Sequence, residues 1–65
     1  MVIWIDFVDR NTPGWYWIDQ HFDNIEELVD YVFSREVLIV KPYEDDRERY
    51  AAIVVDKITE VLAEF

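Results

Sequence analysis

The stretch RYAAIVVDKITEVLAEF, residues 49–65, decides the fold class of this protein because it admits two interpretations. Its β-branched residues would suit a fourth strand. Its apolar residues, however, recur at helical spacing and fall within an arc of about 140° on a helical projection. The members of this arc are Tyr50, Ala51, Val54, Val55, Ile58, Val61, Leu62 and Phe65.

The residues that precede this stretch favour the helical interpretation. Asp45 and Glu48 have the spacing of a capping box, in which each side chain satisfies a backbone N–H at the start of a helix. Asp46 adds negative charge where the helix dipole favours it. The stretch also lacks the apolar–polar alternation of a half-buried strand. We therefore predict one long helix over residues 46–64.

The first third of the chain predicts a β-hairpin. Residues 2–8 (VIWIDFV) and 15–22 (WYWIDQHF) are rich in β-branched and aromatic residues, as strands are. Between them, residues 9–14 (DRNTPG) supply the Asn, Pro and Gly that turns require. The two strands are therefore expected to pair antiparallel.

A helix and a third strand follow the hairpin. Asp23, with Glu26 three residues on, predicts a helix start, and apolar residues at helical spacing continue to about Arg35. Residues 37–40 (VLIV) predict a strand inside the sheet. A right-handed crossover would place this strand parallel to the second and beside the first. The expected fold is α+β, β-β-α-β-α, with a three-stranded antiparallel sheet of order 2-1-3 and two amphipathic helices.

Side chains alternate along a strand, so the predicted hairpin has two faces. Ile3, Ile5 and Phe7, with residues 16, 18 and 22, form an apolar face that suits the core. The opposite face carries Val2, Trp4, Asp6 and Val8 beside Trp15, Trp17, Asp19 and His21. This second face gathers the three tryptophans of the chain.

Three accounts explain the tryptophan face. The long C-terminal helix covers it, or it meets a second copy of the chain, or it meets a foreign protein. Exposed tryptophan is costly in water, at about 25 cal/mol per Å² of apolar surface. Tryptophan is also enriched at the centres of protein interfaces. An uncovered tryptophan face would therefore indicate a binding surface.

Composition and charge limit the classes of function. The chain of 65 residues is expected to form a single domain over its whole length, and it holds 15 acidic and 6 basic residues, with a formal net charge of -9. Such charge disfavours direct binding to nucleic acid or to an anionic membrane. The absence of cysteine, of a basic signal-peptide start and of a long apolar run is compatible with a cytoplasmic protein.

Little in the sequence indicates catalysis. Asp6, Asp19 and His21 together could bind a metal or transfer a proton, but they are also the polar members expected of alternating strands. The single glycine excludes a Gly-rich phosphate loop, and Ser34 lies at a helix end without a nucleophile motif. We expect no enzyme, no metal and no cofactor.

The leading hypothesis is a small acidic module that binds a basic, nucleic-acid-binding site on a partner protein. Rigidly spaced carboxylates stand in for phosphates in such mimics, as in viral and phage proteins that block restriction or CRISPR enzymes. The alternative is a homodimer through the tryptophan face. The expected binding residues are Trp4, Trp15 and Trp17 as apolar anchors, with Asp6, Asp19, Asp45, Asp46 and Glu48 as the charge.

Overall fold

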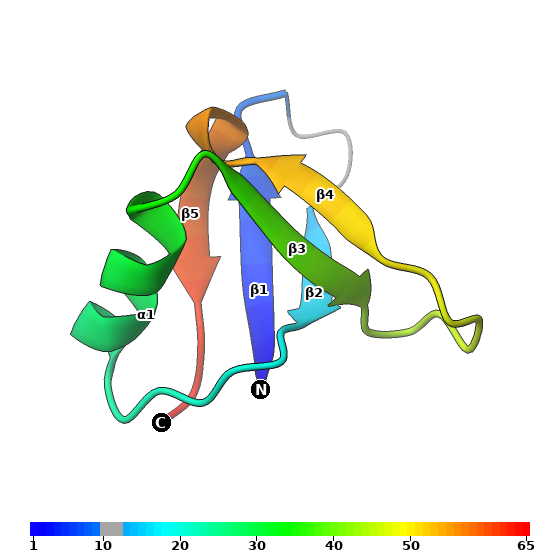
Figure 1. Cartoon of the computed structure of the whole chain (residues 1–65), viewed down its shortest axis with the longest axis horizontal. Helices are drawn as coiled ribbons and strands as arrows, with labels where there is room; N and C mark the ends of the chain where they lie inside the picture. Colours follow the sequence, from blue (N-terminus) through cyan, green and yellow to red (C-terminus); the bar gives the residue numbers. More distant parts are fainter. Residues whose placement is uncertain (10–12) are drawn as a thin grey trace.

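A computed structural model describes residues 1–9 and 13–65 of the chain. Within these residues a single antiparallel sheet has five strands in the order β4-β3-β2-β1-β5 (Figure 1). The elements run β1 (Val2–Phe7), β2 (Gly14–Trp17), α1 (Ile25–Phe33), β3 (Val37–Pro42), β4 (Ala51–Val54), the 3-10 turn η1 (Val55–Lys57) and β5 (Ile58–Leu62).

The predicted three-stranded sheet with two helices is wrong, because the last third of the chain is not a helix. Residues 46–64 instead contain β4, η1 and β5. The strands β4 and β5 form the two edges of the sheet. The β-branched residues of this stretch therefore follow their intrinsic preference for strands. Every neighbouring pair of strands is antiparallel, which agrees with the predicted antiparallel sheet, although β3 was expected to run parallel to β2 and instead pairs antiparallel with it.

The interruption between β4 and β5 explains why the helical period was misleading. Along β4, Ala51 and Ile53 are half-buried while Ala52 and Val54 are exposed, so this strand does alternate. The turn η1 then shifts the phase of the alternation. Thr59 shifts it again, because the register jumps from Phe7↔Ile58 to Asp6↔Glu60 and leaves Thr59 as the extra residue of a β-bulge. These two shifts in the alternation, both within residues 55–59, produce an apolar spacing that resembles that of a helix.

The predicted capping box at Asp45 and Glu48 is also wrong. Asp45 accepts a hydrogen bond from the backbone N–H of Arg47 at 3.0 Å, so it closes a turn and does not begin a helix. The second predicted cap is displaced by one residue. Asn24, and not Asp23, caps α1 by accepting from the N–H of Glu27 at 2.9 Å.

The hairpin is confirmed as an antiparallel pair, with Ile3 opposite Tyr16 and Trp4 opposite Trp15. Its second strand is shorter than predicted and ends at Trp17. The predicted turn covers residues 9–14, of which residues 10–12 lie outside the described part of the chain.

The predicted strand order 2-1-3 is wrong because β3 pairs with β2 and not with β1. Only Lys41 and Pro42, at the end of β3, pair with β2, while residues 37–40 pair with β4. The start of β3 therefore lies well beyond β2. The helix carries the chain to that point beside the sheet, so no right-handed crossover forms.

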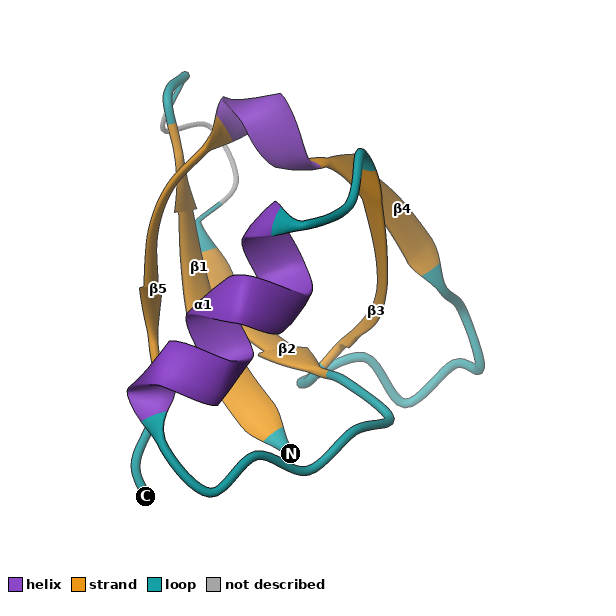
Figure 2. Cartoon of the chain, turned by 60° about the vertical axis from the view of Figure 1, so that its left-hand side comes forward, coloured by secondary structure: helices purple, strands orange, loops and turns teal. Residues whose placement is uncertain are grey.

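The core lies between the sheet and α1, and in Figure 2 the helix sits within the curve of the strands. Leu28 and Val32 of α1 are fully buried against Ile3 and Ile5 of β1. The remaining buried members come from the sheet, from the segment before α1 and from η1: Phe7, Ile18, Phe22, Leu38, Val40, Val55 and Ile58. The sheet thus has one inner face, covered by α1, and one outer face.

Candidate protein-binding surface

The tryptophans lie on the outer face of the sheet. In β1, Ile3, Ile5 and Phe7 point to the core, so Trp4 and Asp6 point the other way. Trp15 lies directly opposite Trp4 on β2. The predicted face is therefore confirmed for Trp4, Asp6, Trp15 and Trp17, the residues that belong to strands.

Backbone pairing brings Trp4 and Trp15 into contact. Ile18 donates its N–H to Met1 O at 2.8 Å, which makes residues 1 and 18 a hydrogen-bonded pair. Hydrogen-bonded and non-hydrogen-bonded pairs alternate along the two strands, so Trp4 and Trp15 form a non-hydrogen-bonded pair. The side chains of such a pair lie closer together than those of a hydrogen-bonded pair. Their rings meet edge to face, with centroids 5.4 Å apart and planes at 70°. Such a contact is worth about 0.5–1.5 kcal/mol beyond burial alone.

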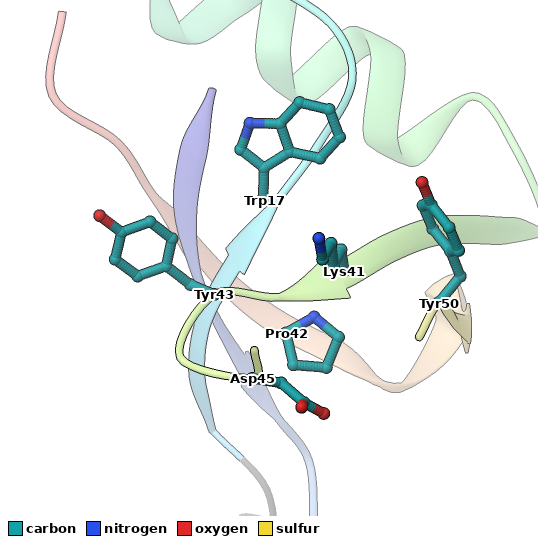
Figure 3. A pocket seen from close by; sticks show the side chains of 6 residues that line it. All are labelled: Trp17, Lys41, Pro42, Tyr43, Asp45 and Tyr50. Carbon is teal, nitrogen blue, oxygen red and sulfur yellow. The ribbon is translucent and has the colours of Figure 1, made fainter. Parts of the chain in front are cut away.

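Further aromatic residues extend this surface across β3. Tyr43 donates its backbone N–H to Trp15 O at 3.1 Å, so it continues the β2–β3 ladder beside Trp15. Trp17, Tyr43 and Tyr50 surround Lys41 and Pro42 at a hollow of about 320 Å³ (Figure 3). We call Trp4, Trp15, Trp17, Tyr43 and Tyr50 the aromatic surface.

The aromatic surface is open to solvent. Trp15 is 45% exposed, Tyr43 56% and Tyr50 69%. The account in which a C-terminal helix covers the tryptophans is excluded for the described chain, since α1 packs on the inner face and residues 46–64 form no such helix. Apolar side chains in this number on one face are typical of an interaction site.

Two carboxylates border the aromatic surface on the outer face. Asp6 follows Trp4 by two residues, and Glu60 lies directly opposite Asp6 on β5. Like charges opposite each other weaken a sheet, so this pair costs stability. Asp6 offsets part of that cost by accepting a hydrogen bond from the N–H of Phe7 at 2.8 Å.

Asp45 does not have the role predicted for it, because its carboxylate forms ion pairs with Arg47 and Arg49 of the same chain. Its side chain is 10% exposed and lies 3.3 Å from Nε of Arg47, while Nε of Arg49 donates to it at 2.7 Å. The backbone N–H of Arg47, followed by the Arg49 side chain, lowers the pKa of Asp45 from 3.8 to about 2. Asp45 thus orders the turn after Tyr43, and Asp46 and Glu48 of the same turn are exposed.

Asp19 and His21 are not brought onto the outer face, because the chain leaves the sheet after Trp17. Both are exposed, and His21 Nε2 lies 3.8 Å from a carboxylate oxygen of Asp23. Within residues 1–9 and 13–65, His, Asp and Glu side chains form no cluster of three that could hold a metal ion. The positions of Asp6, Asp19 and His21 therefore add no support for the metal binding or proton transfer that we considered for these three residues.

A second acidic region lies on α1. Glu26, Glu27 and Asp30 are exposed, while Leu28 and Val32 of the same helix face the core. Glu27 also accepts from the N–H of Asp23 at 2.9 Å. Because α1 covers the inner face, these carboxylates lie on the other side of the sheet from the aromatic surface.

Sequence reasoning missed Tyr43, Tyr50 and Glu60 as members of this site. Tyr50 and Glu60 both lie within residues 46–64, which were predicted as a helix, so the prediction did not place them beside the hairpin. For Tyr43 the signal was present. Alternation along β3 from Ile39 through Lys41 places Tyr43 on the same side of the strand.

Comparisons with protein-family models, with curated protein sequences and with solved structures gave no match to this chain. In the described residues, each helix is too short or too polar to span a bilayer.

Proposed function

We propose that this protein is a small acidic protein-binding module whose aromatic surface docks on a partner protein with a basic surface. The observation that carries the proposal is the Trp4–Trp15 pair on an open sheet face, with Trp15 45% exposed. Large, rigid aromatic side chains at the centre of a patch are the usual anchors of protein interfaces.

Charge supports a basic partner. The formal net charge of -9 attracts a cationic surface and repels nucleic acid and anionic lipid. Asp6 and Glu60 border Trp4 on the outer face, where they can pair with lysine or arginine. The rings of Trp4 and Trp15 can stack on the same cations.

The sharper form of this proposal is that the partner's basic surface normally binds nucleic acid, so that the protein acts as an inhibitor or regulator. Carboxylates on a rigid sheet are held at fixed separations, as phosphates are on a nucleic acid. In that case duplex DNA should compete with the protein for its partner, and complex formation should weaken steeply as salt rises.

A pull-down from lysate of the host cell tests the aromatic anchor. Trp15→Ala should lose the proteins captured by the wild type, because it removes the most exposed member of the tryptophan pair. Ile25→Ala is the matched control, since Ile25 is 39% exposed on α1, away from the aromatic surface. Equal capture by wild type, Trp15→Ala and Ile25→Ala would contradict the proposal.

A second pair of variants tests the charge. Glu60→Lys and Glu26→Lys change the net charge equally, but Glu60 borders the aromatic surface and Glu26 lies on α1. Only Glu60→Lys should weaken capture at low salt. Equal loss in both variants would mean that overall charge alone drives binding. A particle of twice the monomer mass that reverts to a monomer in Trp15→Ala would favour the homodimer instead.

A further inference from the structure

One edge of the sheet presents unused backbone groups. Val55 donates its N–H to Glu36 O at 3.0 Å, which places residues 55 and 36 in a hydrogen-bonded pair. The register between β4 and β3 continues from that pair, so Ile53 and Ala51 also point their N–H and C=O groups toward β3. Ala52 therefore points both of its groups to the open edge, and Val54 points its N–H there, where no strand of the described chain pairs with them. The C=O of Val54, the N-cap residue of η1, accepts the first hydrogen bond of that turn.

The two edges of the sheet differ in the features that discourage pairing with a further strand. β5 carries a β-bulge at Thr59 and a charge at Glu60, both of which discourage a further strand. β4 (AAIV) has neither a charge nor a bulge nor a proline. An edge that lacks these protective features is a template for another strand.

Apolar side chains flank the open edge on the outer face. Val54 is 52% exposed, and its partner Val37 on β3 is 45% exposed. Ile39, opposite Ala52, is 56% exposed. These side chains form a strip beside the unused backbone groups, so a strand that pairs with β4 can also pack its alternate side chains.

A hollow with an acidic lining lies at the end of the same edge. Phe33, Val37 and Val54 contribute apolar walls, and Glu36 and Asp56 contribute carboxylates. Arg35 also lines this hollow, but its Nε donates to Tyr31 O at 2.8 Å and its guanidinium stacks on the Tyr31 ring at 3.6 Å. The hollow therefore suits the aliphatic stem and the charged head of a lysine or arginine.

From these observations we infer that β4 is a second binding site, which takes an extended peptide segment of a partner protein by strand addition. The backbone of the segment pairs with the N–H and C=O of Ala52 and with the N–H of Val54. Its alternate apolar side chains pack on Val37 and Ile39, and a lysine or arginine enters the hollow between Glu36 and Asp56. Strand addition of this kind derives affinity from backbone hydrogen bonds and specificity from alternate side chains.

Charge selects a basic foreign segment over a second copy of the chain. Two copies would each bring a formal net charge of -9 to the junction. A basic peptide instead meets carboxylates at the hollow.

The experiment uses a synthetic peptide that alternates valine and threonine and carries a lysine at each end. Titrated into the 15N-labelled protein, it should shift the amide signals of Ala52 and Val54 and slow their hydrogen exchange at least tenfold. Peptides with N-methyl groups on one or the other alternate set of amides are the controls. One methylated peptide should fail to bind and the other should bind, because only one set faces β4.

Variants of the protein complete the test. Ala52→Pro removes an edge N–H and should abolish peptide binding, while Ala52→Thr keeps that N–H and should bind. The pair Glu36→Gln and Asp56→Asn should weaken the lysine peptide about tenfold and leave a serine-ended peptide unchanged. Trp15→Ala should bind the peptide normally, which separates this site from the aromatic surface.

Three results would overturn the inference. The first is unchanged binding by a folded Ala52→Pro variant. The second is a set of signal shifts confined to the aromatic surface. The third is concentration-dependent dimerisation that protects the same two amides in the absence of peptide, which would assign the edge to a second copy.

Discussion

The direction in which β4 points its backbone groups leads to a prediction about two neighbouring proline substitutions. Ala51→Pro removes an N–H that faces β3, and Ala52→Pro removes one that faces the open edge. Both residues are alanines in the same four-residue strand, but Ala51 is half-buried against the core and Ala52 is exposed. A larger loss of stability at residue 51 is therefore expected both from the hydrogen bond that the proline removes and from the side of the sheet that the residue faces.

The magnitude follows from the hydrogen bond that each substitution removes. In Ala51→Pro the carbonyl of Val40, which is 1% exposed, loses its partner. A buried acceptor left unsatisfied costs about 1–3 kcal/mol, and the proline ring adds strain inside a ladder. We expect Ala51→Pro to lower the free energy of unfolding by about 2–4 kcal/mol.

Ala52→Pro should be much milder. Proline is tolerated on edge strands where the N–H faces solvent, so we expect a change within about 1 kcal/mol. In the long helix over residues 46–64 both prolines would lie in the interior and cost about 3 kcal/mol or more each. The pair of variants thus also discriminates the observed sheet from the helix.

Urea denaturation followed by tryptophan fluorescence measures both variants against the wild type. A domain of this size is expected to have about 3–10 kcal/mol of stability, so a loss of 2–4 is readily seen. Equal destabilisation by the two prolines, or a larger effect at residue 52, would show that the Ala51 N–H does not face β3 and the Ala52 N–H does not face solvent. That result would also refute the open edge of β4.

Three further predictions concern the core, the helix and the pH response. Leu28→Ala, at a fully buried position of α1, should lower the free energy of unfolding by about 2–5 kcal/mol in the same urea assay. Asn24→Ala should cost about 1 kcal/mol by removing the cap of α1, whereas Asp23→Ala should cost less because only the Asp23 backbone takes part. Asp45 has a folded pKa of about 2, below its ordinary 3.8, so its stabilising contribution is present above pH 3.8 and is lost as the pH falls toward 2. Thermal melts should therefore show a smaller loss of Tm over that range in Asp45→Asn than in the wild type, and parallel curves for the two proteins would contradict the role of Asp45 in the turn.

Local patterns in the sequence were sufficient to predict which elements form in the first two thirds of the chain, but not that β3 pairs with β2. β1, β2, α1 and β3 all occur where composition and periodicity predicted them, with boundaries displaced by a few residues. The tryptophan face was also predictable, because alternation on two paired strands places Trp4, Trp15 and Trp17 on one side. These features depend on residues that are close in sequence or joined by one short turn.

The last third was beyond local patterns, because a strand broken by a turn and a bulge loses its period of two. Val55 is buried at the start of η1, Ile58 is buried directly after it, and Val61 is half-buried beyond the bulge at Thr59. That spacing matches a helix as well as it matches an interrupted strand. Only the pairing of this segment with β1 and β3 distinguishes the strand from the helix. A strand satisfies its backbone groups through distant partners, so its identity is a property of the tertiary structure.

The sequence by itself determined the charge, the aromatic composition and the two faces of the hairpin. The tertiary structure decided what surrounds them. It leaves the outer face uncovered, adds Tyr43 and Tyr50 to the tryptophans, ties Asp45 to the arginines of its own turn and exposes the edge of β4. The physical reason is that exposure and charge pairing depend on which segments meet in space, and here paired residues are up to 58 positions apart in the sequence (62 − 4), as Trp4 and Leu62 are in the β1–β5 pair.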